Sequence, residues 1–415
     1  MSRRAATVVV GIALIAVLGG AVSGWQSSPS DEMVRTLVGR LDLERYKATI
    51  KGLTQFGDRR QGTKRNRDAV DWIEAWLRQV GCPTERVVYT FEARSRSGRG
   101  GQGRSSSSLN PTDRTSTGGR IGRNGSGPGG SSIFGYRRRT GVVRDPMAQP
   151  DEALRALNSE EPSPGDRSEV FCTKIGTTNP DEMYIIGAHM DGHGFGQAAN
   201  DDGSGTAIVM ELARIFSDPS VQTNQSIRFA LWNNEETGLN GSSAYVSQRR
   251  ERQGLESPPG SGRYPEPRWL GMIQHDMMLF DHGAPGPDGR VSRDQRAEAD
   301  VNIEFQERSD LAAESRELAF FFKAANDAFA TDYPAMVGPH MTNTDSTPFM
   351  NVTPSISLRE NERGMHIGAG WDPHWHQPTD VYATFTDDDF RLGLNAAQTT
   401  LAAIAQLVNA TASER

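Results

Sequence analysis

Short apolar runs alternate with amphipathic helical patterns from residue 170 onward, and this alternation constrains the fold more than any other feature. Apolar runs of strand length occupy residues 170–175, 183–188, 226–232, 269–277 and 355–358. Apolar residues spaced for one helical face occupy residues 203–216, 311–329 and 387–408. The alternation predicts an α/β fold: a three-layer α/β/α sandwich with a mixed, mostly parallel central sheet. Ligand sites in such sheets gather at the carboxyl ends of the strands.

The N-terminal part adds further elements to the same domain. Residues 32–56 and 64–80 carry helical periodicity, and residues 86–91 read as a strand. With 415 residues and 36% hydrophobic content, the chain can bury a large core. We therefore assign residues 24–94 and 141–415 to two parts of one domain.

The first residues are typical of an export signal. A positive start at residues 2–4 precedes an apolar run over residues 5–22 and a small-residue cleavage site at residues 21–23. This pattern predicts a signal peptide over residues 1–23 and an exported protein, periplasmic or extracellular. An uncleaved N-terminal anchor is the alternative, because the run is only marginally short for a membrane span. After cleavage we expect no stable membrane insertion.

Residues 95–140 form a low-complexity tract of Gly, Ser and Arg, which predicts a disordered, solvated insertion in the domain. From Arg94 to Arg139 there are ten arginines and one acid, Asp113, a local balance of +9 that leaves −16 for the rest of the chain. The folded body is thus acidic, which argues against nucleic acid as a partner.

The sequence contains two cysteines, Cys82 and Cys172, which is too few for a disulfide framework or a cysteine-rich metal site. In an oxidising compartment they could pair, because both flank strands predicted in the same region. Two buried free thiols are an equally good reading.

Several chemically active side chains follow the predicted strands. His189 ends one strand, with Asp191 two residues later as a candidate to fix its tautomer. Asp201 lies in a turn that opens a helix, where a carboxylate can bridge two cations, although a helix N-cap is the simpler role and Asp202 could fill it equally well. The pair Glu235 and Glu236 follows another strand. Adjacent acids on an irregular turn can point differently, so that one binds metal and the other takes a proton.

Two more candidates come from later in the chain. Asp276 follows an apolar run, and His376 supplies a second imidazole far downstream. Neither is specific alone, because His275 and His374 compete for the same role. It is the order and spacing of all these residues together that indicate a metal site.

These motifs resemble those of the zinc exopeptidase family that includes bacterial leucyl aminopeptidases, aminopeptidase Y, glutamate carboxypeptidase II and, as a divergent branch, glutaminyl cyclase. The matching segments are residues 187–191, 200–205 and 234–238, together with Asp276 and His376, and the resemblance spans roughly residues 53–407. It implies two zinc ions per chain and a zinc-peptidase fold.

Carried over residue by residue, the family pattern assigns a role to each side chain. Asp201 bridges the two zinc ions. Glu236 and His376 bind one ion, and His189 and Asp276 bind the other. Glu235 and Asp191 are then the catalytic residues. Glu235 is the general base, and Asp191 supports the metal ligand His189 without binding zinc itself.

The resemblance implies a zinc-dependent exopeptidase, most simply an aminopeptidase, that hydrolyses peptides with a free N-terminus by means of water activated by two zinc ions. One departure favours an alternative. Trp375 precedes His376 where several peptidases of the family have a tyrosine, and glutaminyl-peptide cyclases, which use one zinc, have a tryptophan there. A non-enzymatic binding module is a third reading, which the survival of every ligand type disfavours.

Two further features concern the surroundings of the site. The family's Ser-Asp-His segment here reads Thr344, Asp345, Ser346, so the local hydrogen bonds must differ. Arg359 and Asn361 precede the segment that carries His376, and we expect them to line the substrate pocket or to hold a surface loop.

Overall fold

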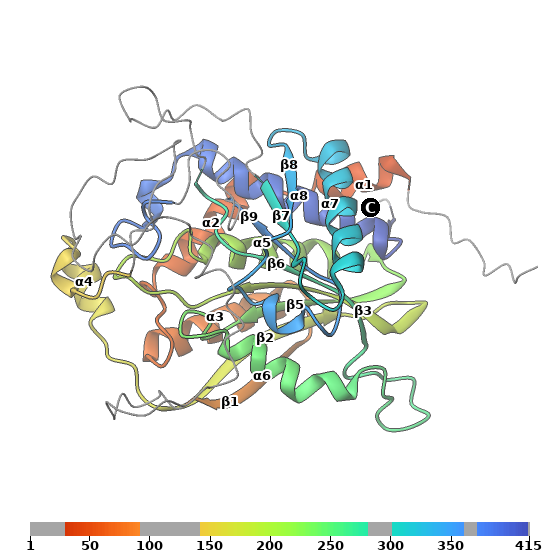
Figure 1. Ribbon diagram of the computed structural model, residues 1–415, viewed down its shortest axis with the longest axis horizontal. Helices are drawn as coiled ribbons and strands as arrows, with labels where there is room; N and C mark the ends of the chain where they lie inside the picture. Colours follow the sequence, from red (N-terminus) through yellow and green to blue (C-terminus); the bar gives the residue numbers. More distant parts are fainter. Residues whose placement is uncertain (1–29, 92–141, 281–300, 361–371, 414–415) are drawn as a thin grey trace, which may run out of the picture.

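An eight-stranded mixed sheet forms the centre of the molecule in the computed structural model, which describes residues 30–91, 142–280, 301–360 and 372–413 (Figure 1). The predicted signal peptide, the 95–140 tract and Asn361 lie outside the described residues. The strands are β1 (Thr84–Phe91), β2 (Gly165–Lys174), β3 (Asn179–His189), β5 (Gln225–Trp232), β6 (Arg268–His275), β7 (Val301–Glu304), β8 (Ala335–Gly338) and β9 (Ser355–Arg359).

The strand order is β1-β2-β5-β3-β6-β9-β7-β8. The four central strands β5, β3, β6 and β9 run parallel to one another, and β7 is parallel to β8. The remaining three pairings, β1 with β2, β2 with β5, and β7 with β9, are antiparallel. The prediction of a mixed, mostly parallel sheet is therefore confirmed. A separate two-stranded sheet joins β4 (Val221–Gln222) to β10 (Thr411–Ala412).

Helices cover both faces of the sheet, but unequally. The larger core packs one face against α1 (Asp31–Val38), α2 (Leu43–Thr54), α3 (Lys64–Gln79), α5 (Gly203–Phe216), α7 (Ala312–Phe329) and α8 (Asp387–Leu407). The other face packs against α6 (Asn240–Arg249) and a cluster of aromatic rings. A short helix, α4 (Glu152–Asn158), lies at the periphery (Figure 1).

Strand β5 shows how the sequence divides the two cores. Ile227, Phe229 and Leu231 belong to the larger core, whereas Ala230 and Trp232 belong to the aromatic cluster. Successive side chains of a strand point to opposite faces, so consecutive apolar residues such as 229–232 predict a strand buried on both faces. The three-layer prediction follows from such runs and is confirmed.

The element boundaries differ from the prediction in a few places. Residues 32–56 form two helices instead of one, because Gly39 ends α1 and the side chain of Asp42 caps α2 by accepting a hydrogen bond from Arg45 N. The strand expected over residues 269–277 ends at His275. Met277 has a φ of 64°, which turns the chain away from the sheet immediately after Asp276.

Cys82 and Cys172 form a disulfide in the structure, which settles the open choice in favour of pairing. The bond joins the turn after α3 to strand β2, beside the register pair Thr84 and Cys172.

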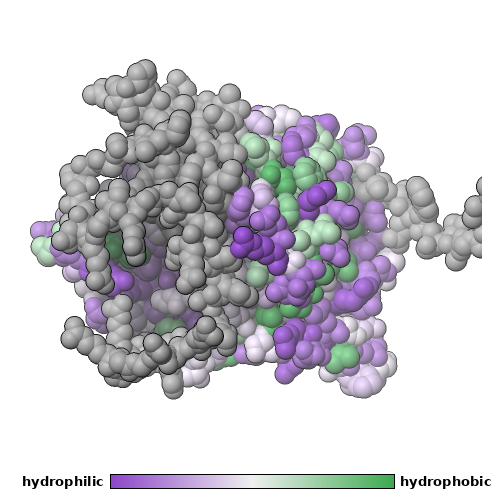
Figure 2. Space-filling model, in the orientation of Figure 1, coloured by the Kyte–Doolittle hydropathy of each residue, from purple (hydrophilic) through white to green (hydrophobic). Residues whose placement is uncertain are grey.

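The outer surface is mixed in character. In the part of the view not covered by grey, hydrophilic residues are interspersed with small hydrophobic patches (Figure 2). Phe320 and Phe321 of α7 are among the exposed large hydrophobic residues. Among the described residues, the helices are too short or too polar to cross a bilayer.

Candidate metal centre

The carboxyl ends of the central parallel strands carry the predicted site. His189 is the last residue of β3, Asp276 directly follows β6, and Arg359 is the last residue of β9. Glu235 and Glu236 follow β5 after a short turn. Since these strands are parallel neighbours, their ends lie at one edge of the sheet, and the side chains converge there.

Asp201 lies at the centre of this group. Its Oδ1 is 3.2 Å from Nε2 of His189, and its Oδ2 is 2.9 Å from Nε2 of His376. The N-cap of α5 is the neighbouring residue, Asp202, whose side chain accepts a hydrogen bond from Gly205 N at 2.9 Å. Asp202 thus takes the helix-capping role, and Asp201 is left facing both imidazoles.

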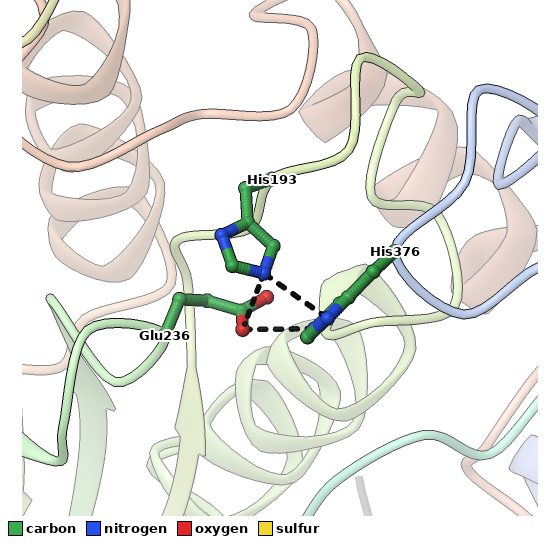
Figure 3. A group of neighbouring side chains, drawn as sticks. All are labelled: His193, Glu236 and His376. Carbon is green, nitrogen blue, oxygen red and sulfur yellow. Dashed lines mark hydrogen bonds and ion pairs between the residues drawn. The ribbon is translucent and has the colours of Figure 1, made fainter. Parts of the chain in front are cut away.

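Two positions for a cation share Asp201, and we refer to them as the first and second metal positions. In the first, His189 and Asp276 approach Asp201, with 3.9 Å between His189 Nε2 and Asp276 Oδ1. In the second, Oε2 of Glu236 lies 2.8 Å from Nε2 of His376 (Figure 3). The five residues predicted to bind metal are therefore brought together.

Glu235 and Glu236 point to different positions although they are adjacent. Glu236 groups with His193 and His376, and also with His189 and Asp201. The carboxylate of Glu235 groups with His189 and Asp276, and the donor atoms of each group lie within 4.8 Å of one another. Asn234, with a φ of 65°, turns the backbone just before the pair. The roles that the sequence suggested for these two acids, metal ligand for Glu236 and base for Glu235, stay predictions.

Asp191 supports the site in another way than expected. Nδ1 of His189 lies 2.9 Å from the backbone carbonyl of Asp191 and 4.0 Å from its carboxylate. The carboxylate instead accepts a hydrogen bond from Glu235 N at 3.0 Å. Its side chain therefore positions the Glu235 turn, and its backbone fixes the His189 tautomer.

The competing histidines lie elsewhere. Nε2 of His275 forms a hydrogen bond with Oγ1 of Thr400 in α8 at 2.8 Å. Burial lowers the pKa of His275 to about 3. Nδ1 of His374 bonds Thr379 Oγ1 at 2.9 Å. The structure places His376 beside Asp201. His275 and His374 lie elsewhere.

Arg359 is buried against Asp276, which corrects both expectations for it: it neither lines the substrate pocket nor holds a surface loop. Its side chain is 1% exposed, and Nη1 donates to Oδ2 of Asp276 at 2.5 Å. Because Arg359 ends the strand next to β6, its guanidinium reaches the carboxylate that follows β6. It orients Asp276 and leaves Oδ1 of that residue toward His189.

Asp345 lies in the segment 344–346, which departs from the family pattern, and its side chain accepts a hydrogen bond from Ser242.

The sequence reasoning missed one histidine of the site. His193 places Nε2 3.2 Å from Oε2 of Glu236 and 3.1 Å from Nδ1 of His376 (Figure 3). The available signal was a histidine between two glycines, Gly192 and Gly194, directly after the His189 motif.

The electrostatics of the group favour a cation. Burial is the main reason that the pKa of Glu236 is raised, to about 7, and burial together with Glu236 raises the pKa of Glu235 well above its usual value. Burial opposes protonation of His376, but Glu236 and Asp201 raise its pKa to about 9. Bound protons therefore offset the negative charge of the crowded carboxylates, and divalent cations would replace these protons.

The donor set fits zinc. Two imidazoles and three carboxylates, with one of the carboxylates shared, are ligand types that zinc prefers. Oε1 of Glu236 is buried with no hydrogen-bond partner among the described residues, which leaves a free donor atom at the second position.

Known proteins resemble this chain in sequence. The model of Peptidase family M28 matches residues 171–399, more than half of the chain. Aminopeptidase YwaD of Bacillus subtilis (strain 168) is 43% identical over 75 residues, 18% of this chain and 16% of that protein. An aminopeptidase of Pseudomonas aeruginosa (strain UCBPP-PA14) is 30% identical over 149 residues, 35% of this chain and 27% of that protein. The aligned segments span less than a third of either relative.

Solved structures resemble it over more of its length. BSAP, a zinc aminopeptidase from Bacillus subtilis, has a TM-score of 0.58 at 18% identity, covering 88% of this chain and 95% of that one. Porphyromonas gingivalis glutaminyl cyclase has a TM-score of 0.53 at 14% identity, covering 88% and 99%. At such identities the likeness shows the fold alone.

Proposed function

The chain belongs to peptidase family M28, and from this premise we propose that it is a zinc-dependent exopeptidase, specifically an aminopeptidase that takes peptides with a free N-terminus. The proposal includes two zinc ions per chain, one at each metal position. It also includes export from the cytoplasm.

The position of Glu235 is the observation that carries the proposal. Its carboxylate lies beside His189 and Asp276 without belonging to the second metal position. The hydrogen bond from Glu235 N to Asp191 holds the turn, and burial keeps the pKa of Glu235 well above its usual value. A carboxylate with raised proton affinity at the edge of a metal pair suits a general base.

Zinc ions held at the two positions would supply Lewis acidity, which would lower the pKa of bound water to about 7 and polarise a carbonyl oxygen; the residues that would hold them are His189, Asp201, Glu236, Asp276 and His376. Glu235 accepts a proton from the attacking water while the oxygen of that water bonds to the scissile carbonyl carbon. Glu235 then returns that proton to the leaving amine as the carbon–nitrogen bond breaks. The net negative charge of the chain outside residues 94–139, −16, attracts the positively charged α-amine of a substrate.

The test uses Glu235→Gln, which keeps the shape of the side chain and removes the base. We expect turnover of an aminoacyl-nitroanilide to fall by about 10²- to 10⁴-fold while the zinc content stays at that of the wild type. The matched variant Glu236→Gln removes a ligand instead and should lower the zinc content. Wild-type turnover by Glu235→Gln would refute the assignment of the base.

Substrates with acetylated N-termini test the specificity. An aminopeptidase requires the free amine, so acetylation should abolish turnover. Equal hydrolysis of free and acetylated peptides would contradict the aminopeptidase reading and leave an exopeptidase of another kind or an endopeptidase.

One observation favours a second candidate, a glutaminyl-peptide cyclase with one zinc. Trp375 stacks on His376, with 3.6 Å between ring centroids, and an indole offers a single donor in place of a phenolic hydroxyl. Release of pyroglutamyl peptide from a substrate with N-terminal glutamine, at one zinc per chain, would support this candidate over the first.

The disulfide between Cys82 and Cys172 supports export, because such bonds persist in oxidising compartments. We propose a periplasmic or extracellular location after cleavage of residues 1–23. N-terminal sequencing of the protein recovered outside the cytoplasm should begin near residue 24. An intact N-terminus on membrane-associated protein would indicate an anchor instead.

A further inference from the structure

His193 reaches the metal centre from the loop between β3 and α5. This loop, residues 190–199, carries none of the five predicted ligands, yet Nε2 of His193 lies beside both His376 and Glu236 (Figure 3). The rings of His193 and His376 meet edge to face, with centroids 4.1 Å apart and planes at 87°.

The loop is built to hold this imidazole in place. A Cβ at Gly194, which has a φ of 101°, would lie 2.4 Å from the carbonyl carbon of His376, so only glycine allows the two backbones this close approach. On the other side, Arg59 is buried and donates to the carbonyls of Gln197 and Ala198 at 2.8 Å each. The loop is thereby fixed both to the His376 segment and to the domain core.

The protons on the two imidazoles follow from the neighbours of each nitrogen. Nε2 of His376 faces the carboxylates of Asp201 and Glu236, so this nitrogen must be the one that binds a cation at the second position. A neutral imidazole that binds metal through Nε2 carries its proton on Nδ1. The nitrogen nearest to that Nδ1 from the neighbouring loop is Nε2 of His193, 3.1 Å away.

We propose that His193 is a positioning residue: its Nε2 accepts a hydrogen bond from Nδ1–H of His376 and so fixes the tautomer and ring orientation of that ligand. Metal-binding histidines usually give this proton to a carboxylate, a backbone carbonyl or water, as His189 does to the carbonyl of Asp191. In the second metal position an imidazole takes that place. The inference rests on the proposed zinc enzyme and names a residue outside its ligand set.

The experiment compares His193→Ala with His193→Gln, whose amide oxygen can still accept the hydrogen bond. Zinc affinity is measured by competition with a chromophoric chelator, with His374→Ala as a control that removes a histidine from the same segment as His376. We expect His193→Ala to weaken binding of one zinc by about 10- to 100-fold. His193→Gln and His374→Ala should stay within about threefold of the wild type.

Two further readouts separate positioning from other roles. Nitrogen-15 spectra of the zinc-loaded wild type should show a slowly exchanging Nδ1 proton on His376, which His193→Ala loses. The absorption spectra of the cobalt-substituted wild type and His193→Ala should indicate the same number of nitrogen ligands. Circular dichroism checks that each variant is folded. If the alanine variant is not, His193→Leu carries the test, because leucine fills the space of the imidazole but cannot accept a hydrogen bond.

Unchanged zinc affinity and an unchanged Nδ1 resonance in His193→Ala would overturn the inference. So would loss of a nitrogen ligand from the cobalt spectrum, because His193 would then bind the metal itself. If the wild-type protein bound no zinc, the proposed function would fail; if only the variant comparison failed, this inference alone would fall.

Discussion

The two metal positions share Asp201 but are held by different parts of the molecule. The first is built from strand ends: His189 and Asp276 are almost fully buried, and their outer partners are a backbone carbonyl and the buried guanidinium of Arg359. The second is built from loops. His376 has a φ of 56°, a conformation that a residue with a side chain rarely adopts, and its partner His193 is 19% exposed.

This difference separates what the sheet fixes from what the loops must supply. The register of β3 and β6 sets the first position, so its geometry has the stability of the core. The second position depends on the packing of residues 190–199 against residues 376–380, which includes the hydrogen bond from Gln197 N to Asp380 O at 2.7 Å. We therefore expect the first position to stay formed without metal and the second to depend on metal for its order.

The largest effect should come from removing the residue that both positions share. Asp201→Asn keeps the size of the side chain but removes the charge that faces both imidazoles. We expect the zinc content to fall from about two ions per chain to less than one, and activity to fall by more than about 10³-fold. Elemental analysis and nitroanilide hydrolysis measure the two. Asp68→Asn, at a partly exposed carboxylate that pairs with Lys64, serves as a control. Full zinc content in Asp201→Asn would contradict the bridging role.

The next effect sharpens the description of the first position. Arg359→Met leaves the buried Asp276 without its partner, and we expect the free energy of unfolding of the metal-free protein to fall by about 3–5 kcal/mol. Zinc should restore part of this loss, because it supplies a positive charge to the same carboxylate. Denaturant unfolding with and without zinc measures both values.

The matched control for that variant is Arg228→Met. Arg228 forms a buried pair with Glu266 at 2.6 Å, far along the strand from the metal centre. We expect Arg228→Met to lower the free energy of unfolding by a similar amount. Zinc should restore none of the part of this loss that comes from the broken ion pair. Equal rescue of the two variants would show that zinc does not act through Asp276.

The second position should depend on pH. Glu236, with a pKa of about 7, and His376, with a pKa of about 9, are protonated in the metal-free protein at low pH and must release those protons to bind zinc. Affinity should therefore rise between pH 6 and 9, by up to about tenfold per pH unit for each proton displaced. Zinc titrations by calorimetry in buffers of different ionisation enthalpy measure the protons released. A flat profile would contradict this account.

The smallest effect concerns local order. Zinc should slow amide hydrogen exchange in residues 190–199 and 372–380 more than in β3 and β6, by about tenfold or less. Exchange followed by mass spectrometry compares the segments. Equal protection of the strands and the loops would remove the distinction between the two positions.

The sequence predicts the ligands at the strand ends better than the residues that orient the ligands, for a physical reason. Apolar runs locate the ends of β3 and β6, so His189 and Asp276 could be placed at one edge of the sheet before the structure was known. The contacts of His193 and Arg359 depend on how a glycine-rich loop folds back and on which strand lies beside β6. Neither follows from local patterning.

The missed elements have similar causes. Helix α6 has few apolar residues besides Tyr245 and Val246, so it lacks a strong helical periodicity. Strands β7 and β8 have four residues each, too few for a distinct alternation. The signal peptide, the disordered tract and the location of the protein stay predictions.

Anomalous diffraction at the zinc edge from crystals of the zinc-loaded protein tests the central claim most directly. The account predicts two peaks about 3.5–4 Å apart, bridged by Asp201, one beside His189 and Asp276 and the other beside Glu236 and His376. A single peak, or a peak away from Asp201, would contradict the dinuclear site.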